Sequence, residues 1–287
     1  MSIKIALAGN PNCGKTTLFN ELTGSNQYVG NWPGVTVEKK EGKLKKELYS
    51  SNEDIIIEDL PGIYSLSPYT TEEIVTRDYL VNNKPDCILN IIDGTNIERN
   101  LYLTTQLKEI GIPMVIAINM LDVVEKNGDK IDLDTLSRSL HCPVLGISAL
   151  KNIGISEVID ATIKEAALGK ADEDSIPHVY TGSVEHSIAH IEETIQDKVP
   201  EKYIRWYAIK RFVRDKKAYS TLNLSKDDES HLENHIRECE EELSDKSVCI
   251  ITKDRYNFIS RLLDRSIIKA TRKDILTTTD TIDRFLT

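Results

Sequence analysis

The stretch that decides the fold is Gly9-Asn10-Pro11-Asn12-Cys13-Gly14-Lys15-Thr16. It fits the pattern G-x-x-x-x-G-K-[ST], in which a glycine-rich loop wraps around phosphate groups. An apolar run over residues 3–8 precedes this phosphate loop, and a helical pattern over Lys15–Thr23 follows it. A chance glycine-rich turn is the alternative, but it would not explain the flanking strand and helix. The motif therefore lies in the strand–loop–helix context that phosphate binding requires.

The residue types within the phosphate loop predict the contacts that a nucleotide makes. Backbone N–H groups of such a loop and the N-terminus of the following helix bind phosphate oxygens. Lys15 should reach the β- and γ-phosphates, and the Thr16 hydroxyl should ligate Mg²⁺. We expect further nucleotide contacts from Asn10, Asn12, Cys13, Gly14 and Thr17. These contacts do not distinguish one base from another.

Residues 1–168 alternate short β-rich runs with helical patterns, which is typical of an α/β domain with a mostly parallel sheet. The predicted strands are residues 3–8, 35–40 with a continuation to 47, Ile55–Asp59, Cys87–Asp93, Met114–Asn119 and 144–148. The predicted helices are Lys15–Thr23, 72–81, 98–110, Leu133–Leu140 and 155–167. We therefore expect a six-stranded sheet with flanking helices.

The pattern changes after residue 168. Residues 169–177 are small, acidic and end in proline, which favours a linker. Beyond them the β-rich runs largely stop, and apolar residues such as Ile188, Ile191 and Ile195 repeat at helical spacing. Ser225 and Asp228 have the spacing of a capping box at the start of another helix. The sequence predicts a small all-α domain over residues 178–272.

Composition limits the class of protein. A chain of 287 residues is long enough for two domains. The five cysteines form no C-x-x-C pair, and this usage favours a reducing cytosol over a disulfide framework. The net charge of −10 argues against a broad nucleic-acid surface. No apolar run approaches the ~18 residues of a membrane span, so we expect a soluble polypeptide.

The identity of the nucleotide base is predicted by a second motif. It is Asn119-Met120-Leu121-Asp122, at the end of a predicted strand. It resembles the N-K-x-D motif of Ras-like GTPases, in which the aspartate accepts hydrogen bonds from guanine N1 and the exocyclic amine. Adenine lacks that donor pair, so the carboxylate would be left unpaired. Met120 keeps an aliphatic stem in place of the usual lysine. Ser148-Ala149-Leu150 resembles the S-A-[KL] loop that contacts the base through backbone amides.

Asp59-Leu60-Pro61-Gly62 follows the strand Ile55–Asp59 and fits the motif D-x-x-G. Asp59 would hold Mg²⁺ through water, and the Gly62 amide would contact the γ-phosphate. Alone, D-x-x-G is often a turn at a strand end. The next residue is Ile63, where Ras-like proteins have a glutamine that orients the attacking water. We therefore expect slow intrinsic hydrolysis.

The segment Gly30-Asn31-Trp32-Pro33-Gly34-Val35-Thr36-Val37-Glu38, here called switch I, makes the resemblance specific. Together with GNPNCGKT, DLPGIYSL, NMLD and SAL, it resembles the N-terminal cytosolic region of ferrous iron transport protein B (FeoB), a bacterial inner-membrane iron(II) transporter with a tethered G domain. The resemblance includes Asp254-Arg255-Tyr256-Asn257-Phe258-Ile259 and extends to about the last residue. In the family a dissociation-inhibitor-like helical domain follows the G domain and transmembrane helices follow that. Residues 273–287 would lead into this membrane domain.

The resemblance also implies the roles of several residues. Thr36 would close onto Mg²⁺ in the GTP state. Asn12 stands where potassium-activated GTPases have an asparagine whose oxygen holds K⁺, and the backbone carbonyls of Gly30 and Trp32 would complete that site. A cation there neutralises charge between the β- and γ-phosphates, as an arginine finger does. Two alternatives stay open: Asn12 as a loop-capping residue, and Trp32 as a surface aromatic packed on its own loop.

The implied function is GTP binding and slow, potassium-stimulated hydrolysis by Lys15, Asn12, Gly62 and Thr36, with GTP or GDP, Mg²⁺ and K⁺ bound. It would regulate iron uptake at the cytoplasmic face of the inner membrane. The partners would be the protein's own membrane domain and small accessory proteins of iron uptake, with no nucleic acid; oligomerisation stays open. The alternatives are a nucleotide-dependent binding switch with negligible turnover and an RNA- or ribosome-associated GTPase.

Two sets of metal-ligand residue types repeat at helical spacing beyond the linker. They are His186 and His190 with Glu193, and His231, His235 and Cys239. Charged residues surround both sets, so the sequence favours solvated helix faces over metal sites.

Overall fold

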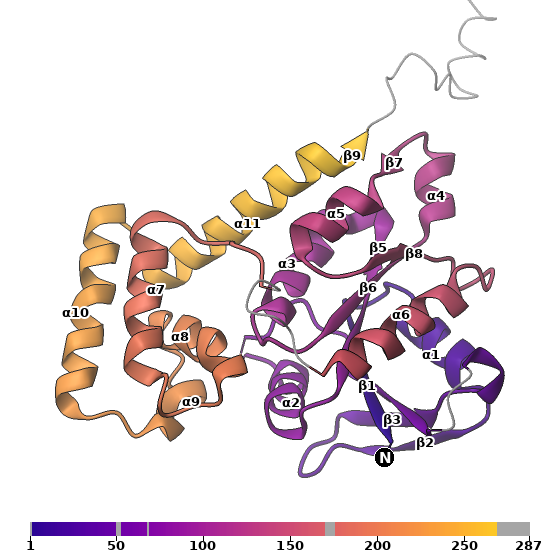
Figure 1. Cartoon of the computed structure of the whole chain (residues 1–287), viewed down its shortest axis with the longest axis horizontal. Coiled ribbons are helices and arrows are strands. Elements are labelled where there is room, and N and C mark those ends of the chain that lie inside the picture. The colour runs from indigo at the N-terminus through magenta and orange to yellow at the C-terminus, as the bar shows by residue number, and fades with distance from the viewer. Residues whose placement is uncertain (1, 50–52, 68, 170–175, 269–287) are drawn as a thin grey trace, which may run out of the picture.

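The computed structural model describes residues 2–49, 53–67, 69–169 and 176–268 (Figure 1). Most of the predicted linker, residues 170–175, lies outside the described residues. So do the last residues of the predicted helical domain and the segment 273–287. The domain boundaries predicted from the sequence stay predictions.

A seven-stranded sheet forms the centre of the N-terminal half, with the order β2-β3-β4-β1-β5-β6-β8. The strands are β1 (Ile3–Gly9), β2 (Gln27–Asn31), β3 (Glu38–Lys43), β4 (Ile55–Asp59), β5 (Cys87–Asp93), β6 (Met114–Asn119) and β8 (Val144–Gly146). The central strand β1 pairs in parallel with β4 and β5, whereas β2 and β3 are antiparallel additions at one edge. The phosphate loop therefore begins at the carboxyl end of the central strand, where α/β sheets bind ligands.

The expectation of six strands was wrong at this antiparallel edge. Residues 27–31 were not predicted because the strand has no buried face, and Tyr28 and Val29 are exposed. It is held by its pairing with β3, from Gln27 opposite Gly42 to Asn31 opposite Glu38. The strand predicted at residue 35 starts only at Glu38, because the preceding residues form a turn, and it ends at Lys43 rather than continuing to 47. Tertiary pairing, not local alternation, decides this edge.

Helices cover both faces of the sheet (Figure 1). They are α1 (Lys15–Thr23), α2 (Thr71–Asp78) with the π-helical turn Tyr79–Asn83, α3 (Ile97–Lys108), α4 (Leu121–Lys126), α5 (Leu133–Leu140) and α6 (Ile155–Leu168). Successive residues of β1 enter different cores: Ile5 and Leu7 pack with α1 and α6, and Ala6 and Ala8 pack with α3 on the other face. Burial on both faces explains why the strand is a continuous apolar run. The mostly parallel sheet with flanking helices is confirmed.

The C-terminal half is helical, as predicted. It contains α7 (Gly182–Ile195), α8 (Ile204–Phe212), the short α9 (Lys216–Tyr219), α10 (Lys226–Leu243) and α11 (Ser247–Ser266). The predicted capping box is present, because Ser225 accepts a hydrogen bond from the Asp228 amide at 3.0 Å and Asp228 accepts one in return. Among the described residues, no helix combines the length and the apolar character needed to cross a membrane.

The helix α11 joins the two halves, running from the helical domain along the G domain (Figure 1). Its first turns pack in the helical core through Ile250 and Ile251, and its later turns pack in a core shared with the G domain through Ile259 and Leu262. A two-stranded pair that the sequence did not predict follows: β9 (Ile267–Ile268) pairs with β7 (Lys130–Ile131) of the G domain.

A buried ion pair fixes the contact between the two halves. Arg255 of α11 donates to Glu109, directly after α3, from Nε at 3.1 Å and from Nη2 at 2.7 Å. The Tyr180 hydroxyl donates to the same carboxylate at 2.5 Å. All three side chains are buried, so removing either Arg255 or Glu109 would leave an unpaired buried charge at a cost of about 3–5 kcal/mol.

Candidate nucleotide-binding site

The phosphate loop is held in a conformation that requires its glycines. Gly14 has φ +93°, and a Cβ there would lie 2.2 Å from Nδ2 of Asn119. Asn12 also has a left-handed backbone, with φ +65°, a conformation that asparagine tolerates better than most residues. The loop then enters α1 at Lys15. The left-handed backbone at Asn12 and Gly14 therefore shapes the loop that leads into α1.

Asn119 ties the phosphate loop to the loop after β8. Its Nδ2 donates to the Cys13 carbonyl at 2.9 Å, and its Oδ1 accepts from the Ala149 amide at 3.0 Å. The side chain is buried. Asn119, predicted to bind nucleotide, thus joins the two loops and positions both. Leu150, next to Ala149, is 88% exposed.

Lys15 and Asp59 are the buried charged pair of the site. The Lys15 ammonium forms an ion pair with the Asp59 carboxylate, and both side chains are almost fully buried. Burial raises the pKa of Asp59, and the Lys15 charge opposes that shift. The neighbouring Thr16 is exposed. Two residues predicted for phosphate and Mg²⁺ binding are thus adjacent, although they are 44 positions apart in the sequence.

Gly62 lies against the phosphate loop. A Cβ on Gly62 would lie 3.3 Å from backbone atoms of Pro11, and the Ile63 amide donates to the Gly9 carbonyl at 3.3 Å. The Ile63 side chain is buried in the core. It therefore cannot orient a water molecule at the site, in agreement with the expectation from the sequence.

Asp122 lies at the predicted base site with a partner that the sequence analysis missed. Lys151 donates to its carboxylate at 2.6 Å, and this hydrogen bond lowers the pKa of Asp122. Met120, two residues before it, has φ +64° and caps α4. Lys151 directly follows Ser148-Ala149-Leu150, but nothing in the sequence pairs it with Asp122. The pair keeps the carboxylate ionised and ready to accept hydrogen bonds.

Switch I forms the turn of the β2–β3 hairpin, with Gly30 and Asn31 in β2 and Glu38 in β3. The Trp32 amide donates to the Val37 carbonyl at 2.9 Å, and the Trp32 carbonyl accepts from the Val35 amide at 3.2 Å. The indole ring is 8% exposed and packs edge-on against Tyr79 at 5.3 Å. The alternative of a surface aromatic on its own loop is therefore wrong.

The other predicted switch I ligands lie within the same hairpin. Thr36 is exposed, and Gly30 is paired with Lys39 of β3. The Trp32 carbonyl already serves a turn, so cation binding through Gly30 and Trp32 stays a prediction, as does the Mg²⁺ role of Thr36.

Cys13 and Asn10 are two further buried residues of the phosphate loop, and only Asn10 has a polar group suited to a ligand. The Cys13 thiol is fully buried, and burial raises its pKa to about 11, so Cys13 fills space and is not a reactive thiol. Asn10 is also buried, but its Nδ2 has no hydrogen-bond partner among the described residues. A buried donor without a partner is costly unless a ligand or water satisfies it. Asn10 therefore suits an oxygen acceptor on the nucleotide.

The segment after Gly62 contacts the helical domain directly. Leu66 donates its amide to Oε1 of Gln106 at 2.6 Å, and its carbonyl accepts from Nζ of Lys210 in α8 at 3.1 Å. Burial lowers the pKa of Lys210 to about 8. Nearby, Arg77 of α2 lies 3.7 Å from Asp215, just after α8. The sequence analysis missed this contact because nothing local to Lys210 marks it.

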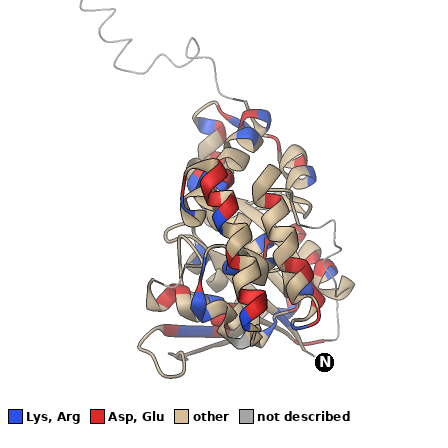
Figure 2. Cartoon of the chain, turned by 90° about the vertical axis from the view of Figure 1, so that its left-hand side faces the viewer, with Lys and Arg blue, Asp and Glu red and all other residues tan. Residues whose placement is uncertain are grey.

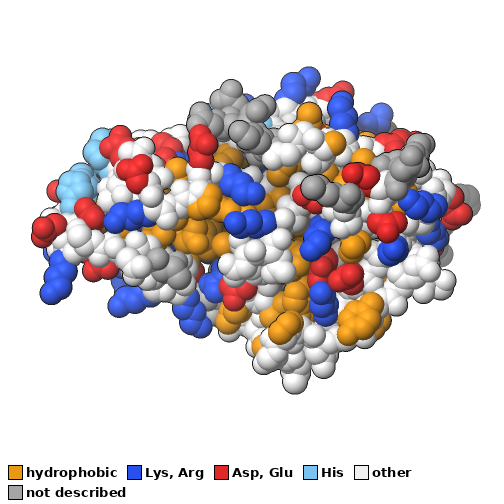
Figure 3. Space-filling model, turned by 60° about the horizontal axis from the view of Figure 1, so that its bottom comes forward, with side chains coloured by type: hydrophobic (Ala, Val, Ile, Leu, Met, Phe, Trp, Pro, Cys, Tyr) orange, Lys and Arg blue, Asp and Glu red, His pale blue; other side chains and the backbone are white. Residues whose placement is uncertain are grey.

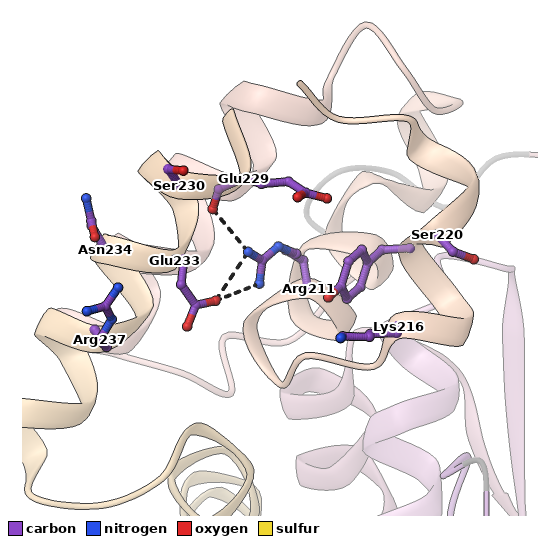
Figure 4. A pocket seen from close by; sticks show the side chains of 9 residues that line it. Arg211, Lys216, Ser220, Glu229, Ser230, Glu233, Asn234 and Arg237 are labelled. Atoms are coloured by element: carbon purple, nitrogen blue, oxygen red, sulfur yellow. Dashed lines mark hydrogen bonds and ion pairs between the residues drawn. The ribbon is translucent and has the colours of Figure 1, made fainter. Parts of the chain in front are cut away.

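A separate hollow of about 630 Å³ lies in the helical domain (Figure 4). Arg211 enters it and lies 3.4 Å from both the Glu233 carboxylate and the Glu229 carbonyl. Glu233 also pairs with Arg214 at 2.8 Å. The hollow lies between α8, α9 and α10 of the helical domain, apart from the phosphate loop of the G domain.

Comparison with known proteins agrees with this geometry. The family model for ferrous iron transport protein B matches residues 3–162. The model for the FeoB cytosolic helical domain matches residues 180–268. The chain belongs to the FeoB family. Both halves of the fold are therefore those of the FeoB cytosolic region, as the sequence motifs indicated.

Relatives and solved structures extend this result. An Fe(2+) transport protein A/Fe(2+) transporter FeoB fusion protein of Porphyromonas gingivalis is 38% identical over 99% of the chain and 34% of its own length. The Fe(2+) transporter FeoB of Escherichia coli K12 is 36% identical over 91% of the chain and 33% of its own length. The chain thus spans about a third of these relatives.

Solved structures of FeoB relatives cover most of the chain. A GDP-bound point mutant of the S. thermophilus FeoB G-domain has a TM-score of 0.86 at 46% identity, covering 93% of this chain and 100% of that one. NFeoB from S. thermophilus bound to GDP.AlF4- and K+ has a TM-score of 0.80 at 46% identity, covering 91% of this chain and 99% of that one.

Proposed function

We propose that this chain binds GTP and hydrolyses it slowly, that K⁺ stimulates the reaction, and that the nucleotide state regulates ferrous iron uptake through a membrane domain. The observation that carries the proposal is the conformation of the phosphate loop. Lys15 lies beside Asp59, and Asn119 joins the phosphate loop to the loop after β8. The S. thermophilus relative bound to GDP.AlF4- and K+ supports both the nucleotide and the cation.

The residues present suit the proposed ions. A buried carboxylate on Asp59 and a hydroxyl on the exposed Thr16 are hard oxygen donors of the kind that Mg²⁺ prefers. Asn12 is exposed at the crest of the loop, where its amide oxygen is accessible to K⁺. When bound, these cations would neutralise negative charge that develops on the phosphates.

The protein's own groups would act on an in-line attack of water at the γ-phosphate. Lys15 would donate to the phosphate oxygens, and the Gly62 amide would hold the γ-phosphate near the loop. Because the Ile63 side chain is buried, the attacking water would be placed by backbone groups of switch I. Ile63 stands where Ras-like proteins have a water-orienting glutamine, which is why we expect slow turnover.

The route to the membrane domain would run through the helical domain. Lys210 joins α8 to the Leu66 carbonyl, which lies in the segment after the D-x-x-G motif. Movement of that segment between GTP and GDP states would therefore alter a direct contact with the helices. Accessory proteins of iron uptake are further candidate partners, since one relative is a fusion with Fe(2+) transport protein A.

The charge distribution disfavours the RNA-associated alternative. Acidic and basic positions are interspersed along the helices that face the viewer in Figure 2, and the net charge of the chain is −10. A nucleic-acid-binding domain usually carries an excess of basic residues on its binding face.

Single-turnover hydrolysis tests the proposal. Excess purified chain is mixed with GTP in MgCl2 and KCl, with ATP as the control, and phosphate release is followed. We expect release from GTP alone. Tight GTP binding without phosphate release would establish the binding switch and contradict the proposed hydrolysis.

A further inference from the structure

Four histidines from two helices lie together on the helical domain, far along the chain from the nucleotide motifs. This histidine cluster consists of His186 and His190 on α7 and His231 and His235 on α10. The sequence analysis treated the two pairs separately, as solvated helix faces. The structure brings them together, and pale-blue side chains gather at one end of the molecule in Figure 3.

The imidazole rings form a continuous set of contacts. Ring centroids are 4.6 Å apart for His186 and His190, 4.6 Å for His231 and His235, and 4.4 Å for His190 and His235 across the two helices. The diagonal distance from His190 to His231 is 6.5 Å. Each helix therefore supplies an i, i+4 pair, and the two pairs face each other.

These separations suit ligands of one metal ion. With a metal–nitrogen distance of about 2.0–2.1 Å and tetrahedral angles, the centroids of two imidazole ligands lie about 5 Å apart. The three neighbouring separations in the cluster are within about 1 Å of that value. The ring spacing is therefore that of ligands to one ion, and what remains is the orientation of the rings.

The rings are not yet in ligating orientations. His190 and His235 are stacked at an interplanar angle of 12°, and in the part of the chain that the structure describes no three His, Cys, Asp or Glu side chains form a ready metal site. His186 and His231 are exposed, and such side chains change rotamer rapidly. Residues beneath them, such as Ile188 and Ile236, are fully buried and hold the helices together. The site would form on metal binding.

Acidic side chains lie near His190 and His235, the two rings that stack across α7 and α10. Glu193 lies 3.7 Å from Nδ1 of His190, and Glu238 lies 3.7 Å from Nδ1 of His235. These distances are longer than a hydrogen bond. On a small approach, a carboxylate at Nδ1 would orient the ring and leave Nε2 as the ligand, which is the usual support for a metal-binding histidine. Cys239 continues the row on α10 but is buried, so it does not belong to the cluster.

We propose that the histidine cluster binds one divalent transition-metal ion, with imidazole ligands from both α7 and α10. Imidazole nitrogens suit zinc, nickel, copper and iron, whereas Mg²⁺ and K⁺ prefer oxygen. The site is therefore chemically distinct from the ion sites of the G domain, and it does not rest on the proposed GTPase activity.

The test is titration of the purified chain with Zn²⁺ by calorimetry and with Co²⁺ by visible absorption, in excess MgCl2. All proteins carry Cys249→Ser, because Cys249 is the exposed thiol among the described residues and would compete for both ions. The test variants are His190→Gln from α7 and His235→Gln from α10. His178→Gln is the matched control, because His178 is exposed and lies outside the cluster.

We expect one ion per chain, at least tenfold weaker binding in each test variant, and unchanged binding in the control. Circular dichroism of each variant should match the parent, since glutamine is a good helix former. Absence of stoichiometric binding in the parent would overturn the proposal. So would binding that survives both test variants, or binding that depends on one helix alone.

Discussion

The phosphate loop is predicted to bind the phosphates and switch I to contribute ligands for Mg²⁺ and K⁺. The two segments are held in place in different ways. The phosphate loop is fixed by its own backbone: Gly14 can accept no Cβ, and Asn119 bonds to its carbonyl. Switch I is mostly exposed; it is held by strand pairing within the β2–β3 hairpin and by one buried ring, that of Trp32. A rigid loop binds phosphate in every state, whereas a mostly exposed hairpin turn is able to change with the nucleotide.

The difference predicts that phosphate-loop variants lose activity under all conditions. Lys15→Ala should lower GTP turnover by about 10²–10³-fold in both KCl and NaCl, because it removes a positive charge from the phosphates. Steady-state phosphate release measures the effect. The exposed Lys4→Ala is the control and should be unaffected. Turnover within a few fold of the parent would mean that Lys15 does not contact the phosphates.

A substitution of Asp122, the predicted base-binding residue in α4, should change the selectivity for the base. Asp122→Asn should weaken GTP binding by on the order of 10²-fold, since the acceptor loses its charge and an amide donor then faces the exocyclic amine of guanine. The asparagine amide presents one donor and one acceptor, which matches xanthine, so XTP affinity should rise. Fluorescent-nucleotide titration measures both affinities, and the exposed Asp134→Asn is the control. Unchanged preference for GTP over XTP would remove Asp122 from the base site.

A substitution of Asn12 in the phosphate loop tests the proposed K⁺ site. Asn12→Gly removes the amide while keeping the left-handed backbone, which glycine adopts without strain. Turnover in KCl should fall on the order of tenfold, a fraction of the 10³–10⁵ that an arginine finger supplies. Turnover in NaCl and GDP affinity should be unchanged. Potassium stimulation that persists in this variant would favour the loop-capping role of Asn12.

The smallest effect on turnover is expected at the contact with the helical domain. Lys210→Met removes the bond to the Leu66 carbonyl and should change turnover by less than about threefold, because the reacting groups are untouched. Its clearer effect is on stability against pH, for which the exposed Lys217→Met is the control.

The sign of that pH effect follows from the pKa of Lys210, which burial lowers from 10.5 to about 8. Between these values the unfolded chain keeps a proton that the folded chain releases, so folding becomes more favourable as pH rises. The free energy of unfolding of the parent, relative to Lys210→Met, should increase by about 1 kcal/mol or more between pH 8 and 10. Denaturant titrations measure it. A flat or falling difference would contradict the burial of this amine.

The sequence predicted those parts of the fold and site that are decided locally. The phosphate loop, the central strands and the Ser225 capping box depend on residues close together in the chain. By contrast, β2 exists because β3 pairs with it, and Lys151 is informative only once it is seen beside Asp122. Trp32 was left open because burial against Tyr79 is a tertiary fact. Contacts between distant segments leave no local signal, so the structure was needed to find them.

GTP turnover by the purified chain in KCl and, separately, in NaCl at equal ionic strength is the most direct test of the account, with ATP as the control. We predict turnover that is specific to GTP and clearly faster in potassium. Equal rates in the two salts, with GTP still bound, would contradict the cation site at Asn12 and place the nucleotide-dependent binding switch ahead of the potassium-stimulated GTPase.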